Sequence, residues 1–364
     1  MPLGNIYLQL PVSTADLSEC VLATVTSASG STPGKPGTSA LFRRSGLLAG
    51  TVGGGILEAR VQEMALEALN KQMPLYGIFT LDSSSTGGED ALCGGNAEIL
   101  VDPDLVRNKS VYDAIKRSLE EKKAGILVTT IRSGNSGKLE VERYWFVPGA
   151  DNSMPAEILE SIGPLADEMM SGPGFRRIKI RSESESLSAE VFAESVIPRP
   201  KLIIAGAGHI GKALSLFGSL LDFEVTVIDD RSDFASKDNL PYADSDINAD
   251  IGSTLEKTGI DGETYIVIVT RGHRDDGNAL RACIGSEAAY VGMIGSRTKI
   301  ATMKHDFIGN GIATEEQWGR IYAPVGIDIN SQTVQEIAVS IAAQLIMIRN
   351  SRGKNASSTA GIHR

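Results

Sequence analysis

Cysteine is scarce in this chain: Cys20, Cys93 and Cys283 are the only three in 364 residues. An odd number of cysteines so far apart does not make the framework of a disulfide-stabilised secreted domain. The dense cysteine spacing that holds iron–sulfur clusters is also missing. We therefore expect a cytoplasmic protein that carries neither disulfides nor clusters of this kind.

Long apolar runs and an excess of positive charge are absent as well. No uninterrupted apolar stretch reaches the roughly 18 residues that a membrane span needs. Residues 1–10 lack the basic start and the apolar core of a signal peptide. The formal net charge is -10, and such a surface repels the phosphodiester backbone of nucleic acids. We expect neither a membrane nor a nucleic acid among its partners.

The first half of the chain reads as a mixed α+β domain over residues 1–197. Short strands and helices alternate there without a regular order, and two prolines in Ile197-Pro198-Arg199-Pro200 mark the linker that ends the domain. The predicted strands cover 20–28, 39–43, 47–52, 75–81, 97–101, 125–131, 144–147, 177–181 and 188–193, and the predicted helices cover 56–69, 111–121 and 156–170.

After the linker the pattern changes to strict alternation of strand and helix. The strands are almost continuously apolar, which is typical of a parallel sheet buried on both faces. This pattern predicts an α/β fold with a Rossmann-like domain over residues 198–349 and helices on both faces of its sheet. The small, polar residues 350–364 are expected to form a disordered tail. The predicted strands are 202–205, 225–228, 265–269, 290–294 and a weaker one at 320–323.

A glycine-rich loop follows the first strand of this second domain and opens a helix. Its sequence is Gly206-Ala207-Gly208-His209-Ile210-Gly211. In a dinucleotide-binding loop, Gly206 permits the tight turn, Gly208 lets backbone amides approach a pyrophosphate, and Gly211 lets helix and strand pack closely. The positive end of the helix dipole then stabilises the bound anion. The alternative is that the glycines only allow a tight turn and nothing binds.

Two aspartates end the second strand of the same domain. Asp229 lies 23 residues beyond Gly206, where an acidic residue hydrogen-bonds ribose hydroxyls, and Asp230 beside it would repel a 2′-phosphate. NAD or another nucleotide is therefore a candidate ligand. His209 is either a ligand contact or a surface residue of the first helical turn, and the sequence leaves both interpretations open.

Two later loops carry basic residues at the carboxyl ends of strands, the edge where open α/β sheets bind ligands. They are Thr270-Arg271-Gly272-His273-Arg274-Asp275-Asp276 and Gly295-Ser296-Arg297-Thr298-Lys299. His273, Arg297 and their basic neighbours suit a phosphate or another oxyanion. The alternative is ordinary capping of the next helices by Ser296 or Asp275.

The N-terminal domain offers two further candidate sites. Amides around Gly53-Gly54-Gly55, with Glu58 in the helix that follows, are suited to cradle a phosphate or a pterin edge. The alternative is that the glycines only let the chain enter the helix without clashes. In Cys93-Gly94-Gly95, which we expect to lie in a loop, a thiolate suits a soft metal or its sulfur ligands. The alternative is that Cys93 is a small buried apolar residue.

Taken in order, several stretches resemble the xanthine dehydrogenase accessory family, XdhC/CoxI. The resemblance runs from about residue 20 to residue 345 and is weakest over 105–195. The matching stretches are ATVTSASGSTPGKPG from Ala23, GTVGGGILEA from Gly50, CGGNAEILVDP from Cys93, IIAGAGHIGKAL from Ile203, VIDDR from Val227, VTRGHRDD from Val269, YVGMIGSRTK from Tyr290 and APVGIDI from Ala323.

The resemblance implies a maturation factor for molybdenum hydroxylases. Such a factor binds the molybdenum cofactor (molybdopterin), assists its sulfuration and delivers it to an apo-enzyme of the xanthine dehydrogenase type. A cysteine desulfurase as a second partner and a homodimeric state belong to the same expectation. The chain is expected to act as a chaperone without catalytic residues of its own. Cys93 is then expected to contact the molybdenum or its dithiolene sulfur.

Two other functions remain open at this stage. The glycine-rich loop also suits an NAD-dependent oxidoreductase, for which His273 beside Asp275 and Asp276 is the one candidate acid–base group. The third possibility is an interaction protein that a nucleotide regulates and that carries no cargo. The sequence does not distinguish the plain cofactor from its dinucleotide form.

Overall fold

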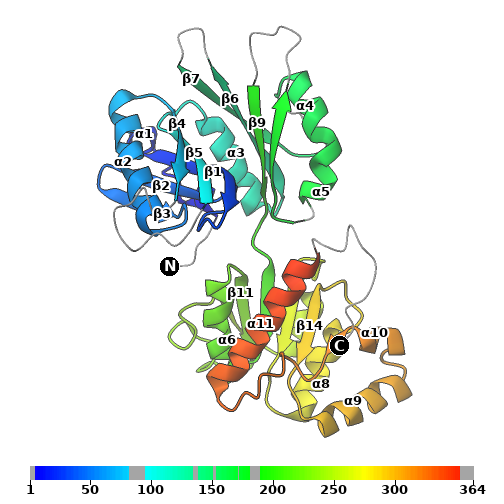
Figure 1. Ribbon diagram of the computed structural model, residues 1–364. Helices are drawn as coiled ribbons and strands as arrows, with labels where there is room; N and C mark the ends of the chain where they lie inside the picture. Colours follow the sequence, from blue (N-terminus) through cyan, green and yellow to red (C-terminus); the bar gives the residue numbers. More distant parts are fainter. Residues whose placement is uncertain are drawn as a thin grey trace. The chain divides into compact units, whose positions relative to one another are not determined.

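The computed structural model describes residues 5–81, 95–133, 138–150, 153–170, 172–180 and 189–352. The chain divides into two compact units between Pro198 and Arg199 (Figure 1). The N-terminal unit contains antiparallel sheets with helices, and the C-terminal unit contains a parallel sheet with helices on both faces. The predicted fold class is confirmed. Among the described helices, none has the length and apolar character that crossing a membrane requires.

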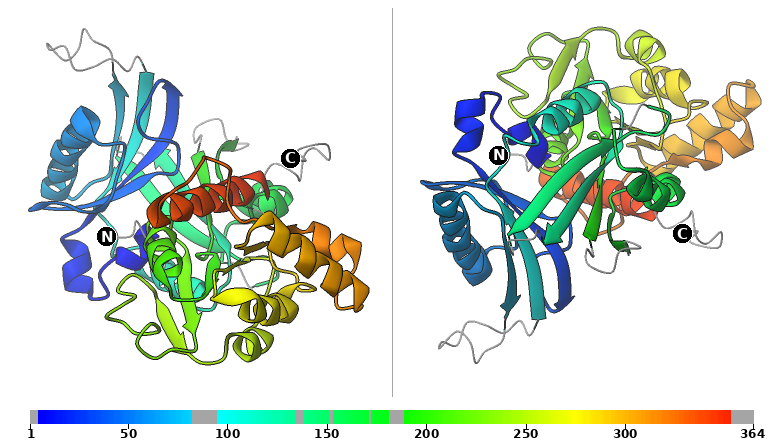
Figure 2. Two further views of the ribbon diagram at one scale, coloured as in Figure 1. Left: turned by 90° about the horizontal axis from the view of Figure 1, so that it is seen from below. Right: turned by 90° about the horizontal axis from the view of Figure 1, so that it is seen from above.

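The first sheet of the N-terminal unit has five antiparallel strands in the order β3-β2-β1-β5-β4. One face is covered by helix α2 (Gly55–Lys71), whose Leu57, Val61 and Leu69 pack into the core of that face (Figure 2). The strands are β1 (Val21–Gly30), β2 (Ser39–Arg43), β3 (Gly46–Gly50), β4 (Leu75–Thr80) and β5 (Gly95–Asp102).

The second sheet of this unit has four antiparallel strands in the order β7-β6-β9-β8. Short helices cover one of its faces. The single helix predicted over 156–170 is instead broken at Gly163-Pro164, because proline has no amide hydrogen for the helix ladder. The elements are β6 (Gly125–Ser133), β7 (Leu139–Phe146), β8 (Phe175–Ile180), β9 (Ala189–Val196), α4 (Ala156–Ile162), the 3-10 helix η2 (Gly163–Leu165) and α5 (Ala166–Met170).

The other faces of the two sheets share a buried layer. Leu22 of the first sheet and Leu127 of the second belong to one apolar cluster. Leu100 of the first sheet and Phe192 of the second belong to another. The first cluster also takes in the 3-10 helix η1 (Ile6–Gln9), α1 (Thr14–Ser18) and α3 (Lys109–Glu120). The N-terminal unit is therefore built in layers around one shared core.

The C-terminal sheet has six parallel strands in the order β12-β11-β10-β13-β14-β15. The strand order reverses between β10 and β13, the switch point where open α/β sheets bind ligands beyond their carboxyl ends. The strands are β10 (Lys201–Ala205), β11 (Glu224–Asp229), β12 (Ser245–Asn248), β13 (Thr264–Ile268), β14 (Tyr290–Met293) and β15 (Ile321–Tyr322).

Helices cover both faces of this parallel sheet (Figures 1 and 2). On one face lie α6 (His209–Leu220) and α11 (Val334–Arg352), and Thr333 and Glu336 form a capping box at the start of α11. α11 continues to Arg352, so residues 350–352, expected in a disordered tail, are helical, and residues 353–364 of that expectation lie outside the described residues. The other face is covered by α7 (Ile251–Lys257), α8 (Gly272–Cys283), α9 (Arg297–Gly309) and α10 (Glu315–Gly319).

Candidate functional site

The glycine-rich loop of the C-terminal unit lies between β10 and α6, as predicted. Two of its glycines are required by the backbone itself. Gly206 has a φ of +114°, and a Cβ there would lie 2.6 Å from the Val269 carbonyl oxygen. A Cβ at Gly211 would lie 1.9 Å from the Gly206 carbonyl oxygen. Both positions therefore allow a close approach of chain segments that no side chain permits.

Gly208 differs from its two neighbours in the loop. Its φ of -66° and ψ of -171° are open to any residue, and a Cβ there would meet no described atom within 4 Å. Glycine at this N-cap position offers no side-chain acceptor to the first-turn amides of α6, which have no acceptor within the helix. The tight turn alone does not account for this glycine. The space at this glycine is open and lies at the N-terminus of α6, where the backbone amides of a helix suit an anion.

Asp229 is almost completely buried at the end of β11. Its carboxylate accepts hydrogen bonds from the Ala207 amide (2.7 Å) and from the amide, Nε and Nη2 of Arg231. Burial opposes the charged form, but these hydrogen bonds hold the pKa of Asp229 below its usual value. The Asp229 carboxylate, which was expected to meet ribose, therefore already supports the glycine-rich loop through Ala207, and a ribose hydroxyl would have to share it with Arg231.

A polar hollow lies beyond the ends of β11, β12 and β13. Asp230, exposed at its rim, is 3.6 Å from Arg271, a pair too solvated to contribute much stability. Arg231 and Arg271 thus offset the two aspartates, which weakens the expected repulsion of a 2′-phosphate. Sequence reasoning missed Arg231 as a site residue, although it stands only two residues after Asp229. The hollow is lined by Asp229, Asp230, Arg231, Asp250, Ile251, Gly252, Thr270, Arg271, Asp275 and Asn278.

The predicted basic residues lie at the starts of helices, and the two loops after β13 and β14 differ in how the next helix is capped. His209, His273 and Arg297 are exposed in the first turns of α6, α8 and α9. Ser296 caps α9 through the Lys299 amide (3.2 Å), so the capping alternative holds for that serine. Asp275 does not cap α8, because its N-cap, Arg271, has no side-chain hydrogen bond.

Lys299 is not free to meet an anion, contrary to what its place among basic residues suggested. Its ammonium pairs with the carboxylate of Asp276, which is fully buried in α8. The other oxygen of Asp276 accepts a hydrogen bond from the Thr270 hydroxyl at 2.5 Å. The sequence suggested Asp276 only as a partner of His273, whereas the structure pairs it with Lys299 and Thr270.

The Gly53-Gly54-Gly55 turn leads into α2 with φ angles of +126°, +75° and +58°. These angles alone explain three glycines, because they lie in the region that side chains rarely adopt. Glu58 accepts a hydrogen bond from the Thr51 hydroxyl at 2.7 Å and thereby braces the same turn. The structural alternative is sufficient here, and the anion-binding role of this turn stays a prediction.

Cys93 and Gly94 lie outside the described residues. Gly95 was expected in a loop, but it begins β5, where a Cβ would be 2.6 Å from the Ser29 carbonyl oxygen. Cys20 and Cys283 are buried in the core, and Cys20, which was expected to begin a strand, directly precedes β1. Within the described ranges, no group of three or more His, Cys, Asp or Glu residues is placed to hold a metal ion.

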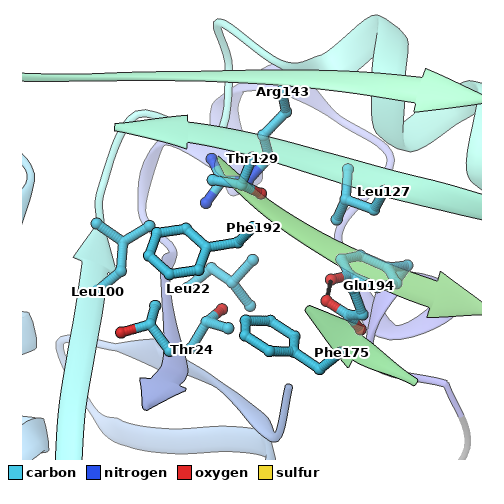
Figure 3. Close-up of a pocket in the computed structure, with 11 residues that line it drawn as sticks. Leu22, Thr24, Leu100, Leu127, Thr129, Arg143, Phe175, Phe192 and Glu194 are labelled. Atoms are coloured by element: carbon cyan, nitrogen blue, oxygen red, sulfur yellow. Dashed lines mark hydrogen bonds between the residues drawn. The ribbon is translucent and has the colours of Figure 1, made fainter. Parts of the chain in front are cut away.

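The N-terminal unit contains a small cavity between its two sheets, lined by both apolar and polar side chains (Figure 3). Glu194 and Tyr7 meet at its wall, where the Tyr7 hydroxyl donates to the carboxylate at 2.7 Å. Arg143, also at the wall, forms a buried ion pair with Asp102. The cavity measures about 10 Å³, the space of about one water molecule. It is too small for a cofactor, so the glycine-rich edge of the C-terminal unit remains the best-supported binding site.

Both units match known family models. Residues 15–79 match the XdhC and CoxI family, and residues 202–345 match the XdhC Rossmann domain. The second match includes the glycine-rich loop, the two aspartates and both basic loops described above. The two matches stand in the order that the sequence motifs predicted.

Individual proteins show the same relationship. The chain is 25% identical over 353 residues to a probable xanthine dehydrogenase subunit from Bacillus subtilis (strain 168), covering 95% of this chain and 98% of that protein. It is 31% identical over 153 residues to the uncharacterized protein YqeB of Escherichia coli (strain K12), but it covers just 28% of YqeB. A crystal structure of a xanthine dehydrogenase from Bacillus halodurans matches with a TM-score of 0.77 at 24% identity, over 99% of this chain and 98% of that one. At this identity the structural match shows the shared fold.

Proposed function

Because the chain belongs to the XdhC and CoxI family, we propose that it is an accessory factor in the maturation of a xanthine dehydrogenase-type molybdenum hydroxylase. In this role it binds the molybdenum cofactor as cargo and delivers it to the apo-enzyme. The near full-length similarity to a probable xanthine dehydrogenase subunit from Bacillus subtilis supports the link to such an enzyme.

The observation that carries the binding proposal is the open space at Gly208. The backbone there needs no glycine, and a side chain at this N-cap position would enter the open space at the start of α6. A phosphate in that space would receive hydrogen bonds from amides and the favourable end of the helix dipole. The phosphate of a pterin cofactor or of a nucleotide meets this requirement.

The polar hollow beside the loop suits the further groups of such a ligand. It combines carboxylates, guanidinium groups and the Thr270 and Asn278 side chains, all of which can hydrogen-bond a sugar or a base. A dinucleotide form of the cofactor would extend from the glycine-rich loop into this hollow. When bound, the cargo supplies the molybdenum chemistry to the client enzyme, and the chain's own residues hold the phosphate end.

Three finer expectations belong to the same proposal. Cys93 contacts the metal or sulfur end of the cargo, since a soft thiolate suits a soft metal. A cysteine desulfurase supplies the sulfur for the cofactor. The chain acts as a homodimer, the commonest symmetric assembly.

An NAD-dependent oxidoreductase is the second candidate, favoured by the same loop and hollow. It requires an acid–base group, and His273 is the candidate for that role. Within the described part of the chain His273 has no carboxylate partner, because Asp276 bonds to Thr270 and Lys299. A histidine without such a partner is less well oriented for proton transfer.

The identity of the released ligand tests the proposal. Protein purified from molybdate-replete cells should release molybdopterin or its dinucleotide form, detected by mass spectrometry. Gly208→Val should reduce the ligand content at least about tenfold, a loss of about 1.4 kcal/mol. Gly309→Val is the matched control, because Gly309 is also open to solvent but ends α9. Release of NAD without any pterin would support the oxidoreductase instead.

A further inference from the structure

A buried charged cluster lies behind the proposed binding edge. Asp276 belongs to α8 and has 0% of its surface exposed, while the side chain of Lys299 in α9 is 24% exposed. The Lys299 ammonium pairs with one oxygen of Asp276, and the Thr270 hydroxyl donates to the other. These three residues come from both basic loops and the helices that follow them.

Burial makes the geometry of this cluster demanding. A carboxylate without water is costly unless its charge is paired and its oxygens accept hydrogen bonds. Asp276 meets both conditions only while Thr270 and Lys299 keep their places. The cluster therefore couples the start of α8 to the start of α9.

The backbone at Thr270, one member of this cluster, runs beside the glycine-rich loop. A Cβ at Gly206 would lie 3.0 Å from the Thr270 Cα, so the chain at Thr270 runs directly beside the turn of that loop. On the other side, Ser296 caps α9 through the amide of Lys299. A shift of Asp276 or Lys299 would thus displace the segment at Thr270 and the start of α9, which border the proposed binding edge of the sheet.

We propose that Asp276 and Lys299 are positioning residues, which hold the loops after β13 and β14 in the arrangement that receives an anionic ligand. The Lys299 ammonium acts as an internal counter-ion and not as a ligand of the anion. This inference rests on the proposed function, because it requires an anion at the glycine-rich edge.

Asp276→Asn distinguishes the two possible roles of Lys299, direct binding of the anion and positioning of the loops, because the two roles predict opposite changes in affinity. If Lys299 bound the anion directly, removing the competing carboxylate would strengthen binding. If the pair positions the loops, the same change loosens them and weakens binding. Salt provides a second readout, because loss of a direct cationic ligand would flatten the ionic-strength dependence of binding, whereas loss of a positioning residue would leave it unchanged.

The experiment measures binding of inorganic pyrophosphate and of NAD⁺ to the full chain by titration calorimetry at two ionic strengths. Asp276→Asn and Lys299→Met should each weaken binding of the probe by about fivefold or more, about 1 kcal/mol or more. The double variant should bind no worse than either single variant, since both act on one unit. Lys304→Met is the matched control on the same helix, where the Lys304 pair with Glu315 is exposed.

The double variant leaves no unpaired buried charge, so it keeps the positioning role testable where a single variant fails to fold. Tighter binding by Asp276→Asn, or binding equal to wild type in all folded variants, would overturn the positioning role and leave the proposed function standing. If the wild-type chain binds neither probe, the anion edge itself is refuted, and this inference with it.

Discussion

Replacing Glu194 with glutamine is expected to stabilise the protein at neutral and alkaline pH while changing little in mild acid. Glu194 lies at the small cavity between the two sheets of the N-terminal unit (Figure 3). Burial raises the pKa of its carboxyl from 4.5 to about 7, against the opposing effects of the Tyr7 hydrogen bond and the Arg143 charge. The folded protein therefore holds a proton on Glu194 that the unfolded chain releases at lower pH.

The sign of the effect follows from this difference in proton binding. Because the folded-state pKa is the higher one, the protonated carboxyl contributes its stability fully below about pH 4.5 and loses it as pH rises to about 7. At ~1.4 kcal/mol per pH unit, the loss is about 3 kcal/mol. Glutamine is neutral throughout and still accepts the Tyr7 hydrogen bond. Its advantage should therefore grow across this range and then remain constant.

The assay is urea unfolding of both proteins from about pH 5 to about pH 8, followed by circular dichroism. The difference in free energy of unfolding should rise by about 2.5 kcal/mol across that range, because part of the effect is already present at pH 5. Tyr7→Phe removes a bond that favours the carboxylate, so it should move the transition to higher pH. Parallel pH curves for wild type and Glu194→Gln would refute the reasoning.

Three further predictions concern the loop, the cysteine and the assembly. Gly211→Ala should cost at least about 2 kcal/mol by thermal unfolding, because its Cβ would lie 1.9 Å from the Gly206 carbonyl oxygen, whereas Gly208→Ala should be nearly neutral. Cys93→Ser should keep folding unchanged but lower the molybdenum retained on purification, and unchanged metal content would count against a ligand role. Light scattering should give twice the 38.6 kDa chain mass, and a monomer at micromolar concentration would contradict the homodimer.

The buried strands of the C-terminal sheet could be predicted from the sequence because both of their faces are covered. The apolar runs at 202–205 and 225–228 lie within β10 and β11. The edge strand β12 (Ser245–Asn248) carries no such run, so no local pattern indicated it. The strand β7, at the edge of the N-terminal unit's second sheet, was predicted only from Tyr144, although Leu139 and Val141 alternate with glutamates in its first half.

The ion-pair partners of the charged residues were harder to predict than the glycine-rich loop. The spacing of Gly206, Gly208 and Gly211 is local, and the structure places all three as expected. The pairing of Asp276 with Lys299 joins residues 23 positions apart and depends on how α8 and α9 pack. One signal was present, since Asp276 shares a helical face with the buried Leu280 and Cys283.

The central claim is that this chain carries the molybdenum cofactor to a client enzyme, and transfer tests it most directly. Protein purified from molybdate-replete cells is mixed with an apo-enzyme of the xanthine dehydrogenase type, and the oxidation of xanthine is followed. The wild-type chain and Gly309→Val should restore activity. Gly208→Val should restore at least about tenfold less xanthine-oxidising activity than the wild-type chain. Equal activation by Gly208→Val and wild type, or no activation by any of the three, would contradict this role.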